Sequence, residues 1–143
     1  MRLEDFYACL GGILSEELIR ELRNQWAHSP QPTNELIYEW VSGLGDAQVL
    51  REVLYALGTH RGSRESQFHT PEGVSTLIAK LAETDARNSI LDPTCGHGLL
   101  LSAVAEVTKP SVVHGIEINS QAVEIANILL GPTASITNGD ALA

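Results

Sequence analysis

Short strand-like runs alternate with helical segments between residues 89 and 138, and this alternation limits the fold more than any other feature of the sequence. The second run is rich in β-branched residues, and the segments between the runs repeat apolar residues at helical spacing. Strand, helix, strand, helix, strand is the order of a parallel sheet with right-handed crossovers. We therefore predict an α/β fold with strands at 89–92, 111–118 and 134–137, and helices at 99–107 and 122–130.

Acidic residues mark the ends of all three predicted strands: Asp92, Glu117 and Asp140. Their separations of 25 and 23 positions match one strand–helix repeat each. Because the carboxyl ends of parallel strands line the ligand crevice of an open sheet, we expect these three side chains to share one edge. Glu117 is placed there to accept hydrogen bonds from ribose hydroxyls, and Asp140 from an adenine amino group.

The loop after the first strand narrows the choice of adenosine-containing ligand. Glycines at 96 and 98 let the backbone approach a ligand closely and expose its amides. A dinucleotide site would prefer the spacing G-x-G-x-x-G, whereas this loop has two glycines and begins with Asp92. That carboxylate would repel a pyrophosphate and suits a cationic amino-acid group. The predicted cofactor is therefore S-adenosylmethionine rather than NAD or FAD.

The first 60 residues predict a separate helical bundle. Ser15 and Asp46 are suitable helix caps, and Gly58 stands where a helix-ending glycine is expected. Residues 61–66 are polar and predict a linker, so the sheet domain spans 67–143. At its start, Thr70 is predicted to cap a helix with Pro71 in the first helical position. Four residues give this helix an apolar face: Val74, Leu77, Ile78 and Leu81.

Four motifs in fixed order resemble the adenine-specific DNA methyltransferases, with the closest likeness to the methylation subunit of type I restriction-modification systems. They cover about residues 66–143 and run Gln67-Phe68-His69-Thr70-Pro71, then Leu91-Asp92-Pro93-Thr94-Cys95-Gly96-His97-Gly98, then Gly115-Ile116-Glu117-Ile118-Asn119, then Gly139-Asp140-Ala141-Leu142. The resemblance implies a Rossmann-like class I methyltransferase sheet, of which this chain holds the first three parallel strands.

The resemblance also assigns roles. The segment containing Phe68, Thr70 and Pro71 would pack over the methionine end of the cofactor. The loop with Asp92, Pro93, Gly96 and Gly98 would hold its amino-acid part. Glu117 would bind the ribose, Ile118 would stack on adenine, and Asp140 with Ala141 would contact the adenine edge.

Two departures from the family pattern matter. His97 replaces the usual Ser or Thr, and we expect its larger ring to point toward solvent. The family's catalytic Asn/Asp-Pro-Pro-Phe/Tyr segment, which holds the flipped base, does not occur in the 143 residues. We therefore assign no catalytic residue and expect a truncated, cofactor-binding portion. Without the family's fourth strand, residues 89–92 should form an open edge of the sheet. We expect the chain to self-associate at this edge or to cover it with its own helices.

Charge and cysteine content exclude several functions. The net charge is −9, with 9 basic and 18 acidic residues, so no basic stripe is available for DNA. DNA contacts are expected to come from missing regions or from partner chains, such as specificity and restriction subunits. The histidines and the two cysteines show no metal-ligand spacing. No membrane span or secretory signal is evident, which favours a cytoplasmic domain.

Other readings stay open. The chain could be a non-catalytic interaction module, or a half that pairs with a separately encoded catalytic chain. It could also belong to a methyltransferase acting on RNA or on protein. A dehydrogenase is the weakest alternative.

We expect these 143 residues alone to transfer no methyl group, because they contain no segment to hold a target amine. The measurement is incorporation of a tritiated methyl group from S-adenosylmethionine into adenine-containing duplex DNA. Robust adenine methylation by the isolated chain would contradict this prediction.

Overall fold

The structure is a computed structural model, and it describes residues 7–8, 10–25, 39–40, 42–59, 70–82 and 89–143. These residues fall into two compact units, Met1–Ser66 and Gln67–Ala143. The predicted linker 61–66 and Phe68 lie outside the described residues. Among the described residues no helix is long and apolar enough to cross a membrane.

The described residues of the first unit are largely helical and include α2 (Glu16–Gln25) and α4 (Ala47–Thr59). Ser15 caps α2 by accepting a hydrogen bond from the Leu18 amide (3.3 Å), and Asp46 caps α4 by accepting from the Gln48 and Val49 amides at 2.9 and 3.1 Å. Both predicted caps are confirmed. The prediction for Gly58 is wrong, because α4 continues through this glycine to Thr59.

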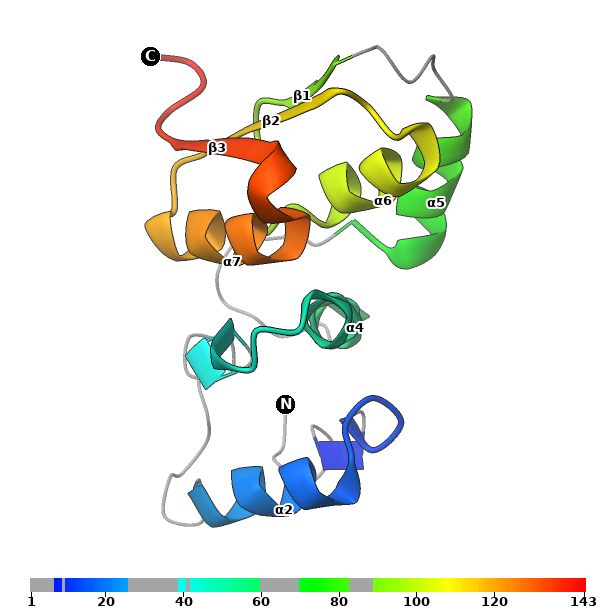
Figure 1. Cartoon of the computed structure of the whole chain (residues 1–143), viewed down its shortest axis with the longest axis vertical. Helices are drawn as coiled ribbons and strands as arrows, with labels where there is room; N and C mark the ends of the chain where they lie inside the picture. Colours follow the sequence, from blue (N-terminus) through cyan, green and yellow to red (C-terminus); the bar gives the residue numbers. More distant parts are fainter. Residues whose placement is uncertain (1–6, 9, 26–38, 41, 60–69, 83–88) are drawn as a thin grey trace. The chain divides into compact units, whose positions relative to one another are not determined.

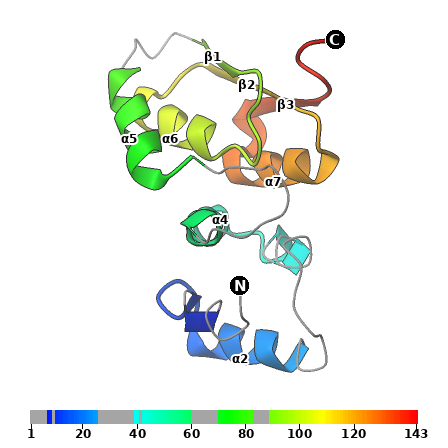
Figure 2. The ribbon, with the colours of Figure 1, turned by 180° about the vertical axis from the view of Figure 1, so that it is seen from behind.

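The second unit is an α/β layer structure with a three-stranded parallel sheet in the order β1-β2-β3. Its elements are, in chain order, α5 (Glu72–Leu81), β1 (Ser89–Asp92), α6 (Leu99–Thr108), β2 (Val112–Glu117), α7 (Ser120–Leu130), a 3-10 turn η1 (Gly131–Thr133) and β3 (Ala134–Asn138). The predicted α/β fold and its three strands are confirmed, with boundaries within two residues. Figure 1 and the reverse view in Figure 2 show α5, α6 and α7 together on one face of the sheet.

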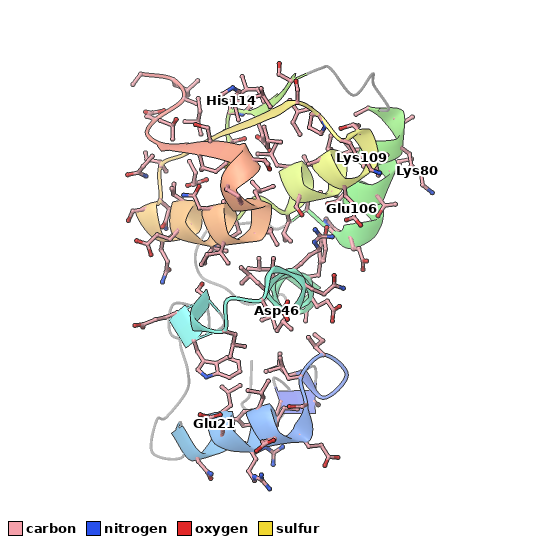
Figure 3. All side chains as sticks on the ribbon, viewed as in Figure 1. Glu21, Asp46, Lys80, Glu106, Lys109 and His114 are labelled. Atoms are coloured by element: carbon pink, nitrogen blue, oxygen red, sulfur yellow. The ribbon has the colours of Figure 1, made fainter. Side chains whose placement is uncertain are left out.

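The core of this unit lies between the sheet and the helices. Cys95, Leu101 and Val113 are its buried centre, and five partly buried residues pack against them: Ile90, Ala105, Leu130, Ala134 and Ile136. Alternate residues of β2 point to opposite faces. Val113 and Gly115 are buried, whereas His114 between them is exposed on the face away from the helices (Figure 3).

Gly115 is required by this packing. A Cβ atom at this position would lie 2.7 Å from the Cys95 sulfur and 2.8 Å from Ile136 Cδ1. Those distances are shorter than real Cβ contacts. The backbone of β2 can therefore lie this close to Cys95 and Ile136 only where it carries a glycine.

The start of α5 differs from its prediction. Pro71 has φ −58° and ψ 146°, so it is extended and precedes the helix rather than occupying its first turn. Its carbonyl accepts the first helical hydrogen bonds, from the Val74 and Ser75 amides at 2.9 Å each. Thr70 lies outside the helix and does not cap it through its side chain. Its carbonyl instead accepts a 3.5 Å hydrogen bond from the Ser75 hydroxyl.

The buried face of α5 consists of small residues. Ser75 and Ala79 are fully buried, and α5 packs chiefly against α6. Small side chains let two helices approach closely, which explains why this face is the one in contact. The predicted apolar face is on the surface: Val74, Leu77, Ile78 and Leu81 are all exposed. In the described part of the chain β1 pairs only with β2, so it forms an edge as predicted. Self-association at that edge stays a prediction.

We expect Gly115→Ala to lower the free energy of unfolding by about 1–3 kcal/mol, because the added methyl group overfills the core. Gly73→Ala is the matched control. Gly73 lies in α5 with no atom within 4 Å of the new methyl group, so alanine should stabilise the helix by roughly 0.5–1 kcal/mol. Urea unfolding followed by circular dichroism measures both, and equal stability of the two variants would contradict this account.

Candidate functional site

The three predicted acids lie at the same edge of the sheet. Asp92 and Glu117 are the last residues of β1 and β2, and Asp140 follows β3 by two residues. The strands are parallel, with Asp92 beside Gly115 and Glu117 beside Asn138, so all three chain segments leave the sheet in the same direction.

The Glu117 carboxylate joins two of these segments. One oxygen accepts a hydrogen bond from the Gly96 amide (3.0 Å), and the other accepts from the Asn119 amide (2.8 Å). The first bond spans 21 positions and fastens the loop after β1 to the end of β2. Hydrogen bonds to an ionised carboxylate are stronger than those between neutral groups. The Glu117 side chain therefore fixes the position of one loop relative to the other.

The loop between β1 and α6 is held by local hydrogen bonding and by hydrogen bonding to β2. The Asp92 carboxylate accepts a hydrogen bond from the Thr94 amide (2.9 Å), and the Cys95 amide donates to the Ile116 carbonyl (3.0 Å). Gly96 and Gly98 have φ values of +54° and +82°, in the left-handed region that favours glycine. Pro93 and Thr94 are exposed at the tip of the loop.

The two glycines face different surroundings. A Cβ atom on Gly96 would have open space around it, so nothing crowds the outer side of the loop there. A Cβ atom on Gly98 would meet the side chains of Ala126 and Leu130 at 3.2 Å each. Gly98 therefore lets α7 pack closely against the start of α6, in addition to any contact with a ligand.

His97 is buried, with 6% of its surface exposed, so the expectation of a solvent-pointing ring is wrong. Gly98, in the left-handed conformation, is the N-cap of α6, so His97 directly precedes this helix. His97 is thus part of the interior of the loop.

Cys95 is a core residue. It lies in the centre of the buried cluster, next to Gly115. Burial, with smaller contributions from Asp92 and Glu117, raises the pKa of its thiol from 9.0 to about 11. A protonated, buried thiol is a poor nucleophile at neutral pH, so the geometry supports a packing role over a Cys/His catalytic pair.

Ile118, Asp140 and Ala141 lie on the surface of this edge. Ile118, which follows the half-buried Glu117, is 70% exposed. Asp140 and Ala141 are exposed, and the Asp140 carboxylate accepts a hydrogen bond from the Leu142 amide (2.9 Å). Thr70 is half-buried and Pro71 exposed at the start of α5.

Two asparagines next to the predicted acids also shape the site. Asn119 caps α7, because its side-chain oxygen accepts hydrogen bonds from the Gln121 and Ala122 amides at 2.9 and 3.2 Å. Asn138 donates from its side-chain amide to the carbonyls of Glu117 and Ile118. For Asn138 the sequence did offer a signal, since it directly follows the predicted strand 134–137 and precedes Gly139.

Known proteins resemble this chain in sequence and in fold. The family described as N-6 DNA Methylase matches residues 45–135. A solved structure with a similar fold is the type I restriction-modification system methyltransferase subunit from Streptococcus thermophilus, at 22% identity and a TM-score of 0.55. The similarity covers 71% of this chain and 25% of that one, so the chain spans about a quarter of that subunit's length. No protein with a curated description matches the chain.

Raising the pH through the range from 9 to about 11 should lower the free energy of unfolding. The unfolded chain releases the Cys95 proton near pH 9.0, while the folded chain keeps it until about pH 11. Above pH 9 the unfolded state therefore binds fewer protons, and stability falls with pH. Urea unfolding at several pH values measures the slope. Cys95→Ala should be less stable overall and have a shallower slope; an unchanged slope would contradict the prediction.

Proposed function

The chain belongs to the N-6 DNA methylase family, and we propose on that basis that its second unit holds S-adenosylmethionine at the edge formed by the three strand ends. The observation that carries the proposal is the Glu117 carboxylate, which joins the loop after β1 to the loop after β2. These two bonds support the proposal because they connect the predicted amino-acid loop with the predicted ribose-binding residue.

The chemistry of the donor set supports this ligand. S-adenosylmethionine carries a sulfonium and an ammonium group, and the edge presents the carboxylates of Asp92, Glu117 and Asp140. Anionic side chains favour such a cation and disfavour a pyrophosphate. When bound, the cofactor supplies an activated methyl group on its sulfonium.

Each residue has capacity for a further partner. An ionised carboxylate offers about four acceptor sites, and the Glu117 carboxylate accepts two amide hydrogen bonds within the chain. Its other sites suit the two ribose hydroxyls. The exposed side chain of Ile118 offers an apolar surface for one face of adenine, and Asp140 can accept from the adenine amino group.

The amino-acid end of the cofactor belongs, in this proposal, to the loop that begins at Asp92. The open space beside Gly96 allows close approach of a ligand to its backbone. Thr70 and Pro71, which precede α5, and Phe68 before them, are proposed to cover the methionine end.

We propose further that the methyl group is destined for adenine in DNA, since the family is described as acting on DNA at the N-6 position. With 18 acidic and 9 basic residues, the chain is repelled by a phosphate backbone. Target recognition and base binding are therefore assigned to other segments or subunits, including specificity and restriction subunits of a type I system.

Isothermal titration with S-adenosylmethionine tests the cofactor proposal. We expect Glu117→Gln and Asp140→Asn each to weaken binding by about 10-fold or more, because a charge-assisted hydrogen bond contributes roughly 1.5–3 kcal/mol. Glu124→Gln is the matched control, an exposed acid on α7 whose loss should leave affinity unchanged.

Absence of S-adenosylmethionine binding by the folded wild-type chain would refute the proposal. Micromolar binding of NAD in its place would revive the dehydrogenase alternative. Equal losses in Glu124→Gln and in the two site variants would show that only net charge matters.

A further inference from the structure

Asn138 links the ends of β2 and β3 through its side chain. Its amide nitrogen Nδ2 donates hydrogen bonds to the carbonyl oxygens of Glu117 and Ile118, both at 3.0 Å. The next amide along the chain, Gly139 N–H, donates to the same Glu117 carbonyl at 3.0 Å. Asn138 and Gly139 thus donate three hydrogen bonds to the successive carbonyls of Glu117 and Ile118.

This arrangement uses the geometry of an asparagine side chain. The Nδ2 group carries two hydrogens, one for each carbonyl. The regular ladder between β2 and β3 ends at the pair Glu117 and Asn138, so the Ile118 carbonyl lies beyond it. The Asn138 side chain continues the pairing by one residue after the backbone ladder has stopped.

The residues that it holds are those of the proposed adenosine site. Glu117 is fixed at its carbonyl by Asn138 and Gly139, and at its carboxylate by the Gly96 and Asn119 amides. Ile118 lies between these anchors, and 70% of its surface is exposed.

We propose that Asn138 is a positioning residue for the adenosine half of the cofactor, acting through Glu117 and Ile118. The inference rests on the proposed function. Asn138 fixes the backbone between the ribose acceptor and the adenine-stacking residue, and it sets their position relative to Asp140 two residues later. A loop ordered before binding loses less conformational entropy when the ligand arrives, so the clamp increases affinity without contacting the ligand.

The test is titration of S-adenosylhomocysteine, which shares the adenosine half, into three proteins: wild type, Asn138→Ala and Asn127→Ala. We expect Asn138→Ala to bind about 3- to 30-fold more weakly, from the loss of two hydrogen bonds. Asn127→Ala makes the same chemical change at an exposed position of α7 and should bind as the wild type does. Far-UV circular dichroism checks that every variant is folded.

Asn138→Asp separates the hydrogen bonds from the shape of the side chain, because it keeps the size of asparagine and removes both donor hydrogens. At neutral pH its carboxylate faces two carbonyl oxygens with no proton to donate, so binding should be at least as weak as in Asn138→Ala. A role of the side chain in filling space alone would leave Asn138→Asp with wild-type affinity.

The outcomes separate the two proposals. A wild-type chain that binds neither S-adenosylhomocysteine nor S-adenosylmethionine refutes the proposed function, and this inference with it. A wild-type chain that binds, together with an Asn138→Ala variant of equal affinity, refutes the positioning role alone. Wild-type affinity in Asn138→Asp also counts against it.

Discussion

The hydrogen bonds of the Glu117 carboxylate are the interaction on which the sheet edge depends. They connect the Gly96 amide, in the loop after β1, with the Asn119 amide, at the start of α7. Both bonds are charge-assisted and half-buried, so their loss would leave two backbone donors without a partner in the chain. Through this one side chain, the turn into α6 and the turn into α7 are held together.

Small residues lie around the hydrogen bonds of Glu117 and allow close packing there. Gly115 lets β2 pass beneath Cys95, and Gly98 lets Ala126 of α7 approach the start of α6. Burial of Cys95 in the same place raises its pKa, which makes the thiol a packing element. The same principle recurs where α5 meets α6, since Ser75 and Ala79 form the buried face. Close approach of the backbone thus accompanies the apolar packing of this unit.

Much of this arrangement could be predicted from the sequence, and the reasons are local. Strand and helix periods differ, so the alternation from 89 to 138 was readable, and the acids at the strand ends marked the edge. The errors concern residues whose environment comes from distant segments. The contact face of α5 was predicted to be apolar, formed by Val74, Leu77, Ile78 and Leu81. In the structure these four residues are exposed, and α5 buries Ser75 and Ala79 instead. His97 was expected in solvent, whereas it is buried directly before the left-handed turn at Gly98.

The sequence by itself determined the order of strands and helices, the family, and which acids lie at the strand ends, because these depend on residue type and spacing along the chain. The tertiary structure decided how those acids are held. The contact between Glu117 and Gly96 spans 21 positions, and the clamp from Asn138 to Glu117 and Ile118 spans 21 and 20. Such contacts exist only once parallel strands are paired in a fixed register, because the register sets which carbonyl each side chain can reach.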